Sequence, residues 1–260
     1  MTERWRLILD GRSDGATNMA VDRAIFHSVE ARRSPSTLRF FGWSSPTLSL
    51  GYAQGAEILN IERCRELGIG IVKRPTGGKA VLHDAEVTFS ISCPIPSPVF
   101  PDTLKGSCMT INSCVASGLS SLGSGLELSH PSLRGGAARM ACFEGPSAYE
   151  IVANGRKLVG CAQRRTNRAF LQHGSIPFSI QWQTLSCLFR DGTLPPIPKA
   201  IGLRECLGQG IEEHEVIEAL LKSFSEALGV VCELGTLTEE EQELINCYKK
   251  AGLQLTFQGI

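Results

Sequence analysis

The chain has 260 residues, a hydrophobic fraction of 42%, and 26 basic residues balanced by 26 acidic ones. This length and composition favour one large folded domain with a sizeable core over a disordered chain. A net charge of zero argues against a strongly basic nucleic-acid-binding protein. No apolar run reaches the roughly 18 residues of a membrane helix, and no signal-peptide core follows the first residues. We therefore expect a cytoplasmic protein that contacts neither nucleic acid nor membrane.

The first half of the sequence predicts both strands and helices. Strands are expected over residues 5–9, 37–41, 47–50, 69–73 and 80–92. Helices are expected over residues 18–29, 61–67 and 104–122. Thr17 or Asn18 is the expected cap of the first helix, and Gly68 is expected to end the second.

The clearest local signal is a hairpin at Asn154-Gly155, because this pair suits the two positive-φ positions of a type I′ turn. Strands over 149–153 and 156–162 would then place Val152 opposite Lys157 and Glu150 opposite Val159. In that register Lys157 shares a partly apolar face with Val159 and Cys161.

The remaining pattern predicts one more strand, over 169–178, and two helices, over 212–228 and 238–251, the second capped by Thr238. Together these elements give an α/β (α+β) fold class, a mixed β-sheet flanked by helices with a small helical part at the C-terminus. We expect residues 1–200 to form one domain and residues 201–260 to form a helical extension packed on it.

A glycine pair, Gly77-Gly78, separates two of the predicted strands. Glycines let the backbone approach a ligand closely and direct N–H groups at it. The flanking Lys73, Arg74 and Lys79 suit an anionic group. An ordinary hairpin turn with surface cations is the alternative. The pattern matches neither a phosphate-binding Walker loop nor a dinucleotide fingerprint.

Cysteine is the other candidate for chemistry. The ten cysteines form no CxxC pair and no zinc-like spacing, so no metal site is expected. Cys142 falls in the predicted loop before the hairpin, a suitable position for a nucleophile. An ammonium nearby would raise its thiolate fraction, and Lys157 is the candidate because the hairpin returns the chain toward Cys142. A buried loop cysteine with a surface lysine is the alternative. His83 and His173, at or beside strands, either orient a substrate or are structural.

Several motifs occur together, in one order, over residues 5–180. They are Asn18-Met19-Ala20, Trp43-x-x-Pro-x-x-Ser-Leu-Gly-Tyr52-x-Gln54, Arg74-x-Thr-Gly-Gly-x-Ala-Val-Leu-His83, Lys157-Leu-Val-Gly-Cys-Ala-Gln163-Arg-Arg165 and Gln172-His-Gly-Ser-Ile176. This set resembles the superfamily of lipoate–protein ligases, biotin ligases and octanoyltransferases. The resemblance implies a catalytic domain of the biotin/lipoate ligase type over residues 1–200.

Within that superfamily, Cys-Phe-x-x-Pro-Ser-x-Tyr-Glu, from Cys142 to Glu150, resembles the LipM-type octanoyltransferases. In those enzymes this cysteine carries an acyl thioester, and the lysine at the position of Lys157 lowers its pKa. The resemblance implies transfer of octanoyl from acyl carrier protein to the lysine of an apo lipoyl-domain protein, such as the glycine-cleavage H protein. It implies no cofactor and no metal.

The same resemblance implies a set of substrate-binding residues: Arg74, Thr76, Gly77, Gly78, His83, Gln163 and His173. The sequence departs from the family pattern at Arg23, where glutamate is usual, and at Cys161, where serine is usual, which puts a second thiol near the site. Three other functions remain as alternatives. They are an ATP-dependent lipoate–protein ligase, an octanoyl amidotransferase acting between lipoyl proteins, and a catalytically silent binding module.

Overall fold

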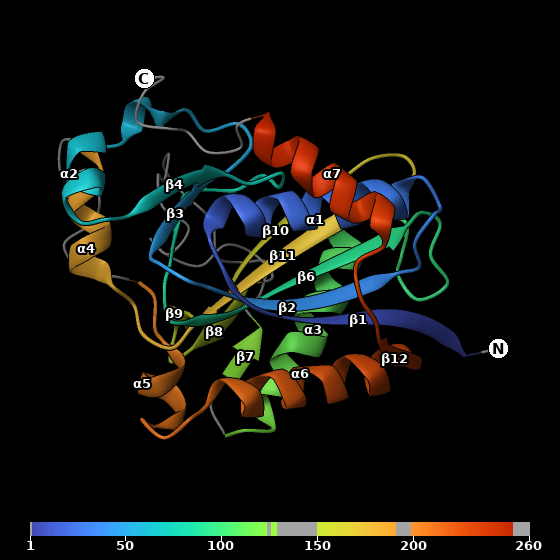
Figure 1. The fold of residues 1–260 in the computed structure, drawn as a ribbon. Helices are drawn as coiled ribbons and strands as arrows, with labels where there is room; N and C mark the ends of the chain where they lie inside the picture. Colours follow the sequence, from blue (N-terminus) through green and yellow to red (C-terminus); the bar gives the residue numbers. More distant parts are fainter. Residues whose placement is uncertain (1, 124–125, 129–149, 191–198, 252–260) are drawn as a thin grey trace.

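The computed structural model describes residues 2–123, 126–128, 150–190 and 199–251. Its centre is a six-stranded mixed sheet (Figure 1). In spatial order the strands are β10 (Gly160–Arg165), β11 (Ala169–Pro177), β6 (Glu86–Pro94), β2 (Thr37–Trp43), β1 (Glu3–Ser13) and β12 (Val230–Leu234). β1 runs parallel to β2 and β12, whereas the pairs from β2 to β10 are antiparallel.

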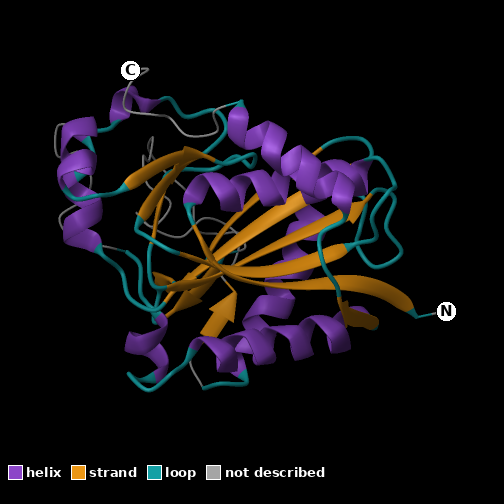
Figure 2. Ribbon diagram, viewed as in Figure 1, coloured by secondary structure: helices purple, strands orange, loops and turns teal. Residues whose placement is uncertain are grey.

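Helices cover both faces of this sheet (Figures 1 and 2). α1 (Gly15–Glu30) and α7 (Glu239–Lys250) lie on one face, and α3 (Leu104–Ser120) and α6 (Glu213–Leu228) lie on the other. The short helices α2 (Ile61–Glu66), α4 (Trp182–Cys187) and α5 (Leu203–Leu207) lie at one end of the molecule, and a 3₁₀ turn, η1, spans Ala56–Ile58. None of the helices in the described part of the chain is long and apolar enough to cross a lipid bilayer.

Two small sheets flank the central one. The first contains β3 (Thr47–Leu50) between β4 (Gly70–Lys73) and β5 (Val81–His83). The second contains β8 (Ile151–Ala153) between β7 (Leu126–Leu128) and β9 (Arg156–Lys157).

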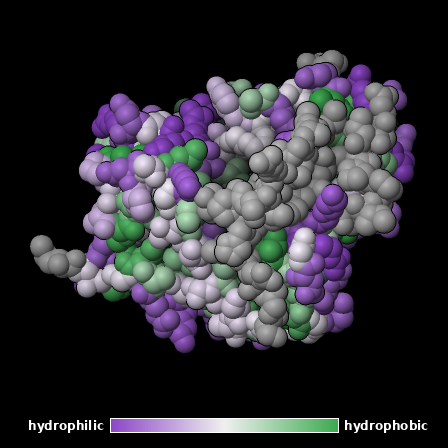
Figure 3. All heavy atoms as spheres, turned by 180° about the vertical axis from the view of Figure 1, so that it is seen from behind, coloured by the Kyte–Doolittle hydropathy of each residue, from purple (hydrophilic) through white to green (hydrophobic). Residues whose placement is uncertain are grey.

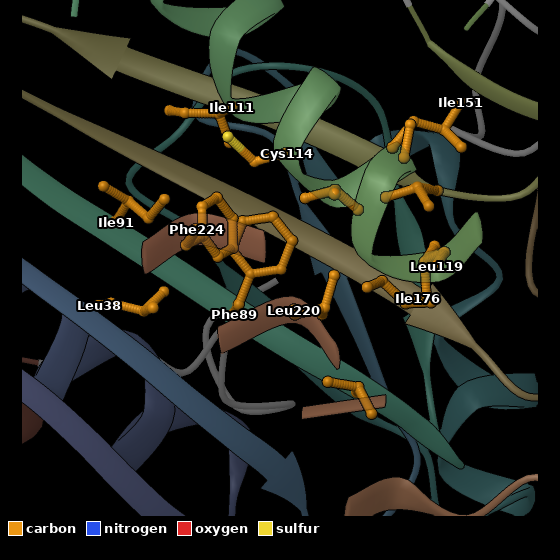
Figure 4. Packing of buried hydrophobic residues seen from close by; sticks show 14 of the residues in the cluster. Leu38, Phe89, Ile91, Ile111, Cys114, Leu119, Ile151, Ile176, Leu220 and Phe224 are labelled. Atoms are coloured by element: carbon orange, nitrogen blue, oxygen red, sulfur yellow. The ribbon is translucent and has the colours of Figure 1, made fainter. Parts of the chain in front are cut away.

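The main hydrophobic core fills the space between the central sheet and the helices α3 and α6. Phe89 of β6 and Phe224 of α6 meet edge to face there, with ring centroids 5.8 Å apart (Figure 4). Along β6 the apolar residues alternate with polar ones, yet both sets are buried. Helices lie on both faces of the sheet, so the strand exposes neither face to solvent. The polar set faces α1, where Ser90 of β6 donates a hydrogen bond to Asp22.

The outer surface seen from behind is mixed, with small groups of hydrophobic residues among hydrophilic ones (Figure 3). Large apolar side chains that are exposed in the described structure include Leu104 and Met109 on α3 and Leu234 at the end of β12. Single exposed apolar residues of this kind are normal for a folded protein.

The C-terminal helices form where the sequence predicts them. Thr238 caps α7, its hydroxyl accepting a hydrogen bond from the N–H of Glu241 at 3.2 Å. Arg23 of α1 lies over the ring of Tyr248, 4.2 Å from its centroid, and joins α1 to α7. The strand β12 between the two helices was not predicted, and it adds to the edge of the central sheet. The domain division at residue 200 stays a prediction.

The predictions at the first helix and at residues 80–92 are wrong. The first helix is capped by Asp14, whose carboxylate accepts from the N–H of Thr17 at 2.9 Å, and not by Thr17 or Asn18. The predicted strand over 80–92 is two strands, β5 and β6, which belong to different sheets. β5 ends at His83 and β6 begins at Glu86, and Asp84 and Ala85 between them belong to neither strand. The sequence pattern over 80–92 did not show that the chain passes from one sheet to another here.

The predicted hairpin is confirmed at its turn, where Asn154 and Gly155 have φ of 51° and 69°, and Val152 pairs with Lys157. Beyond that pair the prediction is wrong. The N–H groups of Leu158 and Val159 both point to the carbonyl of Ile151, at 2.9 and 3.5 Å, so the ladder ends. β10 then joins the central sheet, and Lys157 does not share one continuous strand face with Cys161.

A substitution at Gly174 of β11 would test how tightly this strand packs against β6. Gly174 pairs with Phe89, and a Cβ at Gly174 would collide with the ring of that buried side chain. We expect Gly174→Ala to reduce the free energy of unfolding by about 1–3 kcal/mol, the usual effect of overpacking. Urea denaturation measures the change. Gly11→Ala, which meets nothing within 4 Å, is the control. Equal stability of the two variants would contradict this account of the packing.

Candidate active site

A cleft opens on the α1 side of the sheet, and we call it the α1-side cleft. Its walls come from α1, β2, β5, β6, β10, β11 and Arg74, which follows β4. The side chains of Met19, Phe41, Trp43 and Val81 give it apolar walls, and those of His83 and His173 add polar ones. Cys161 and Ala162 line it from the edge strand β10.

Arg74 organises the glycine turn from inside the protein. Its guanidinium donates to the carbonyls of Gly77 and Lys79, both at 2.7 Å, and to the carbonyl and hydroxyl of Ser49, both at 3.0 Å. Arg74 is buried, so the alternative of a turn with surface cations is wrong at this residue. Gly78 has a φ of 84°, in the left-handed region that glycine adopts readily. The turn is therefore held in one shape by a buried charge.

His83 is fixed by partners on its ring face and on both nitrogens. Its ring stacks on Trp43, with centroids 4.0 Å apart. Nδ1 lies 2.9 Å from a Glu86 carboxylate oxygen, and Nε2 lies 2.7 Å from the hydroxyl of Ser49. The other Glu86 oxygen accepts from Ser175 at 2.9 Å. His83 therefore contributes a rigid wall to the cleft.

His173 has the same kind of support. Nε2 lies 3.0 Å from a carboxylate oxygen of Asp22, and Nδ1 lies 3.0 Å from the hydroxyl of Thr76. These two contacts join α1, β11 and the glycine turn at one point. Each histidine therefore has a hydrogen-bond partner at both ring nitrogens, which fixes the orientation of its ring.

Asp22 is completely buried, and its carboxylate binds the guanidinium of Arg39 at 2.8 Å. Burial by itself would raise the pKa of Asp22, but the charge of Arg39 and hydrogen bonds from His173 and Ser90 lower it to about 2. Arg39 also binds Asp10 at 2.7 Å. The carboxylate is thus charged at neutral pH and holds His173 from behind.

Lys157 is not among the residues that line this cleft. It is 1% exposed, so the alternative of a surface lysine is wrong. Its ammonium donates a hydrogen bond to the carboxylate of Glu150. Its backbone bonds to Lys199 and Ile201, both at 2.9 Å, which fixes the strand. Cys142 lies outside the described residues. Glu150 was not among the predicted site residues, although its place seven residues before Lys157 across a hairpin gave a signal for it.

Gln163 lies on the opposite side of the sheet from the cleft. Its side-chain amide bonds to Gln172 at 3.0 Å and to Ser107 of α3 at 3.2 Å. The structure therefore brings together Arg74, Thr76, Gly77, Gly78, His83 and His173. Gln163 lies on the other face of the sheet, and Lys157 does not line the cleft. Within the described chain, no group of three or more His, Cys, Asp or Glu side chains is arranged to hold a metal ion.

Sequence reasoning missed the buried groups that support these residues, namely Asp22, Arg39, Ser49 and Glu86. A signal was available for the two carboxylates. Asp22 falls in the predicted helix and Glu86 in a predicted strand, each at a position that the pattern assigns to the interior. A buried carboxylate needs a charged or hydrogen-bonding partner, so such positions indicate a polar network.

The fold is that of the enzymes that attach lipoyl-type groups to proteins. A structure of a lipoate–protein ligase from Thermoplasma acidophilum with bound lipoic acid superposes with a TM-score of 0.77, at 23% identity and with 96% of each chain covered. A lipoate–protein ligase A bound with ATP also gives 0.77, at 24% identity, with 96% of this chain and 95% of that chain covered. At these identities the likeness establishes the fold alone.

Residues 14–225 match the lipoyl protein ligase A/B catalytic domain, and the chain belongs to this family. Proteins named octanoyltransferase LipM are similar over most of its length. The one from Moorella thermoacetica is 39% identical, covering 92% of each chain. Those from Kyrpidia tusciae and Bacillus subtilis are 38% and 32% identical, each covering at least 93% of both chains. The predicted family, fold class and acyltransferase class are confirmed.

Asp22→Asn tests the buried network. It leaves Arg39 without its buried partner, and we expect a loss of about 3–5 kcal/mol of unfolding free energy at pH 7. The folded-state pKa of Asp22 is about 2 and its ordinary value is 3.8. Its contribution in the wild type is therefore complete above the ordinary value and is lost as pH falls toward 2. The difference between wild type and variant should shrink over that range in urea titrations.

The matched control is Asp10→Asn, which removes the partly exposed carboxylate that binds the same arginine. We expect a smaller loss from it, because solvent screens that pair. An equal loss from the two variants, or a difference for Asp22 that stays constant with pH, would contradict the assignment.

Proposed function

We propose that this chain transfers an octanoyl group from acyl carrier protein to the lysine of a lipoyl-domain protein, in the cytoplasm, through a thioester on Cys142. Octanoyl transfer in lipoate biosynthesis is the activity of the family members that align over more than nine tenths of the chain. One observation carries the proposal of a thioester. It is the buried ammonium of Lys157, in the hairpin that follows Cys142.

The first half of the reaction forms the acyl-enzyme. The thiolate of Cys142 attacks the carbonyl carbon of the donor thioester, and the carrier thiolate leaves and takes up a proton. Lys157 favours the thiolate form of Cys142 because an ammonium in a low-dielectric site stabilises a nearby anion. Glu150 holds the ammonium in position. Backbone N–H groups of the turn at Gly77 and Gly78, which Arg74 holds, would stabilise the oxyanion.

In the second half, the amine of the acceptor lysine attacks the acyl-enzyme. The nitrogen gains the acyl group and loses a proton, and the thiolate of Cys142 is released. An amide is more stable than a thioester, so this step needs no ATP. The apolar walls of the α1-side cleft, including Met19, Phe41 and Trp43, suit a hydrocarbon chain. Arg74, Thr76, His83 and His173 would define the end of that cleft.

Two protein partners follow from this reaction. The ligase of Thermoplasma acidophilum was studied with its E2 lipoyl domain, which supports a lipoyl-domain protein as acceptor here. The glycine-cleavage H protein is the acceptor that we propose, and octanoyl-acyl carrier protein is the donor. Carrier proteins of this class are acidic, and Arg165 ends β10 while Arg168 directly precedes β11, so both lie at one end of the central sheet. Lys157 cannot contribute to such a docking surface because it is buried.

An ATP-dependent lipoate ligase is the second candidate, since a ligase bound with ATP has the same fold. It would require free lipoate and ATP, and it would not depend on Cys142. This difference separates the two candidates in one assay.

The thioester is tested by mixing the protein with octanoyl-acyl carrier protein without ATP and measuring its intact mass. We expect the mass of one octanoyl group to be added, and hydroxylamine to remove it because it cleaves thioesters. Cys142→Ala should abolish the adduct. Cys161→Ser, which introduces the usual family residue, should retain it. An adduct that survives Cys142→Ala, or activity that needs ATP and free lipoate, would contradict the proposal.

Lys157→Met tests the role of the ammonium, because methionine keeps an apolar side chain of similar length without the charge. An unperturbed thiol has a pKa of about 8.5, and lowering it to about 7 raises the thiolate fraction roughly tenfold at neutral pH. We therefore expect Lys157→Met to slow acylation about tenfold or more at pH 7. The loss should diminish above about pH 9, where a free thiol ionises unaided.

The control for this variant is Arg156→Met, which removes the charge of the neighbouring residue, whose side chain is 39% exposed. Because Glu150 loses its partner in Lys157→Met, the double variant Lys157→Met/Glu150→Gln separates loss of the ammonium from an unpaired carboxylate. A pH–rate profile identical to that of the wild type would remove Lys157 from the reaction.

A further inference from the structure

A second hollow lies on the other side of β10, between this strand and α3, and we call it the α3-side groove. Its lining includes Leu104, Lys105 and Asn112 from α3, Cys161 and Gln163 from β10, and Glu150. A hydrogen bond from Gln163 to Ser107 of α3 shows independently that the Gln163 side chain lies on the α3 face of the sheet.

The groove and the α1-side cleft meet at β10. Cys161 and Ala162 line both. Within the described part of the central sheet β10 is the edge strand, so hollows on its two faces can join around that edge. Glu150, which binds the ammonium of Lys157, also lines the groove. One end of the groove therefore lies beside the proposed reaction centre.

We propose that the α3-side groove binds the phosphopantetheine arm of the octanoyl thioester donor, while the octanoyl chain occupies the α1-side cleft. This assignment rests on the proposed function. It places the thioester, the junction between arm and acyl chain, where the two hollows meet. A donor bound in this way presents its carbonyl carbon next to the pair formed by Lys157 and Glu150.

The chemistry of the lining fits such an arm. Phosphopantetheine is a narrow chain with two amides, a branched aliphatic segment and a terminal phosphate. Asn112 and Gln163 lie in its wall. Gln163 Nε2 already donates to Ser107 and Gln172, and Asn112 Oδ1 accepts from Gln172, but each side-chain carbonyl oxygen has a second lone pair that can accept from an amide N–H of the arm. Leu104 and Cys108 offer apolar contact. Lys105 is exposed at the start of α3, where an ammonium suits the phosphate.

The acceptor lysine fits the groove less well. Its side chain has no amide to match Asn112 and Gln163 and no phosphate to match Lys105. The surface around the groove also suits the donor protein. Leu104 is 53% exposed and Met109 is 38% exposed beside Lys105, which offers an acidic carrier both apolar and electrostatic contact.

Two variants test the groove. Cys108→Phe adds a ring that fills it, and Lys105→Glu reverses the charge at its exposed rim. Each is compared with the wild type for the rate of enzyme acylation by three donors. The donors are octanoyl-phosphopantetheine, octanoyl-pantetheine without the phosphate, and S-octanoyl-N-acetylcysteamine, which lacks most of the arm. Lys222→Glu, a charge reversal at an exposed lysine of α6, is the control.

We expect Cys108→Phe to lower kcat/KM for octanoyl-phosphopantetheine at least tenfold relative to S-octanoyl-N-acetylcysteamine. Lys105→Glu should lower it severalfold relative to octanoyl-pantetheine, and Lys222→Glu should change neither ratio. Ratios that stay constant in both groove variants would overturn the assignment, and so would a defect confined to transfer onto the acceptor. Octanoyl-acyl carrier protein is assayed alongside, and the proposed function fails as well if the wild type is acylated neither by it nor by any of the three free donors. Acylation by the carrier protein but by none of the free donors would overturn the groove assignment alone. The exposed Lys105 keeps the test decisive even if Cys108→Phe does not fold.

Discussion

The site depends on a pair of opposite charges that are both removed from water. Asp22 is 0% exposed and Arg39 is 1% exposed, and their side chains lie 2.8 Å apart on the α1 face of the sheet. A buried charge without a partner is costly, so each of these side chains fixes the position of the other. Asp22 also binds His173, which in turn binds Thr76 of the glycine turn. The ion pair thereby connects a helix, two strands and a turn, and it sets the shape of the cleft.

Helices cover both faces of the central sheet, but one face forms the apolar core and the other holds the polar network of the site. On the α3 and α6 side, Val87, Phe89 and Ile91 of β6 pack into an apolar core. On the α1 side, Glu86 of the same strand contacts His83 directly, and Ser90 binds Asp22, which holds His173. Covering the polar face keeps water from competing for these hydrogen bonds, which makes the network stronger and its geometry more rigid. The stability of the fold and the geometry of the site are therefore built by alternate residues of one strand.

Sequence reasoning identified what local chemistry determines. The hairpin turn at Asn154-Gly155, the cap at Thr238 and the glycine turn all follow from the conformational preferences of a few residues. It did not identify what depends on distant contacts. The N–H groups of Leu158 and Val159 converge on one carbonyl and end a ladder that the sequence pattern continues. Arg74 is buried because its acceptors lie in β3 and in the turn, and no sequence spacing shows this. The relation of Cys142 to Lys157 remains a prediction, because Cys142 lies outside the described residues.

The short link between β9 and β10 has a consequence for how this family motif can vary. Lys157 ends one sheet and Cys161 lies in another, so the residues from Lys157 to Gln163 span a joint. Lys157 carries the ammonium, and Cys161 and Ala162 form the wall that both hollows share. The length of the link between β9 and β10 sets the distance between them. Side chains in the link are therefore free to vary within the space available, whereas its length is not. A single inserted residue would turn Ala162 and Gln163 to the opposite faces of β10 and change the position of the shared wall relative to the Lys157 ammonium.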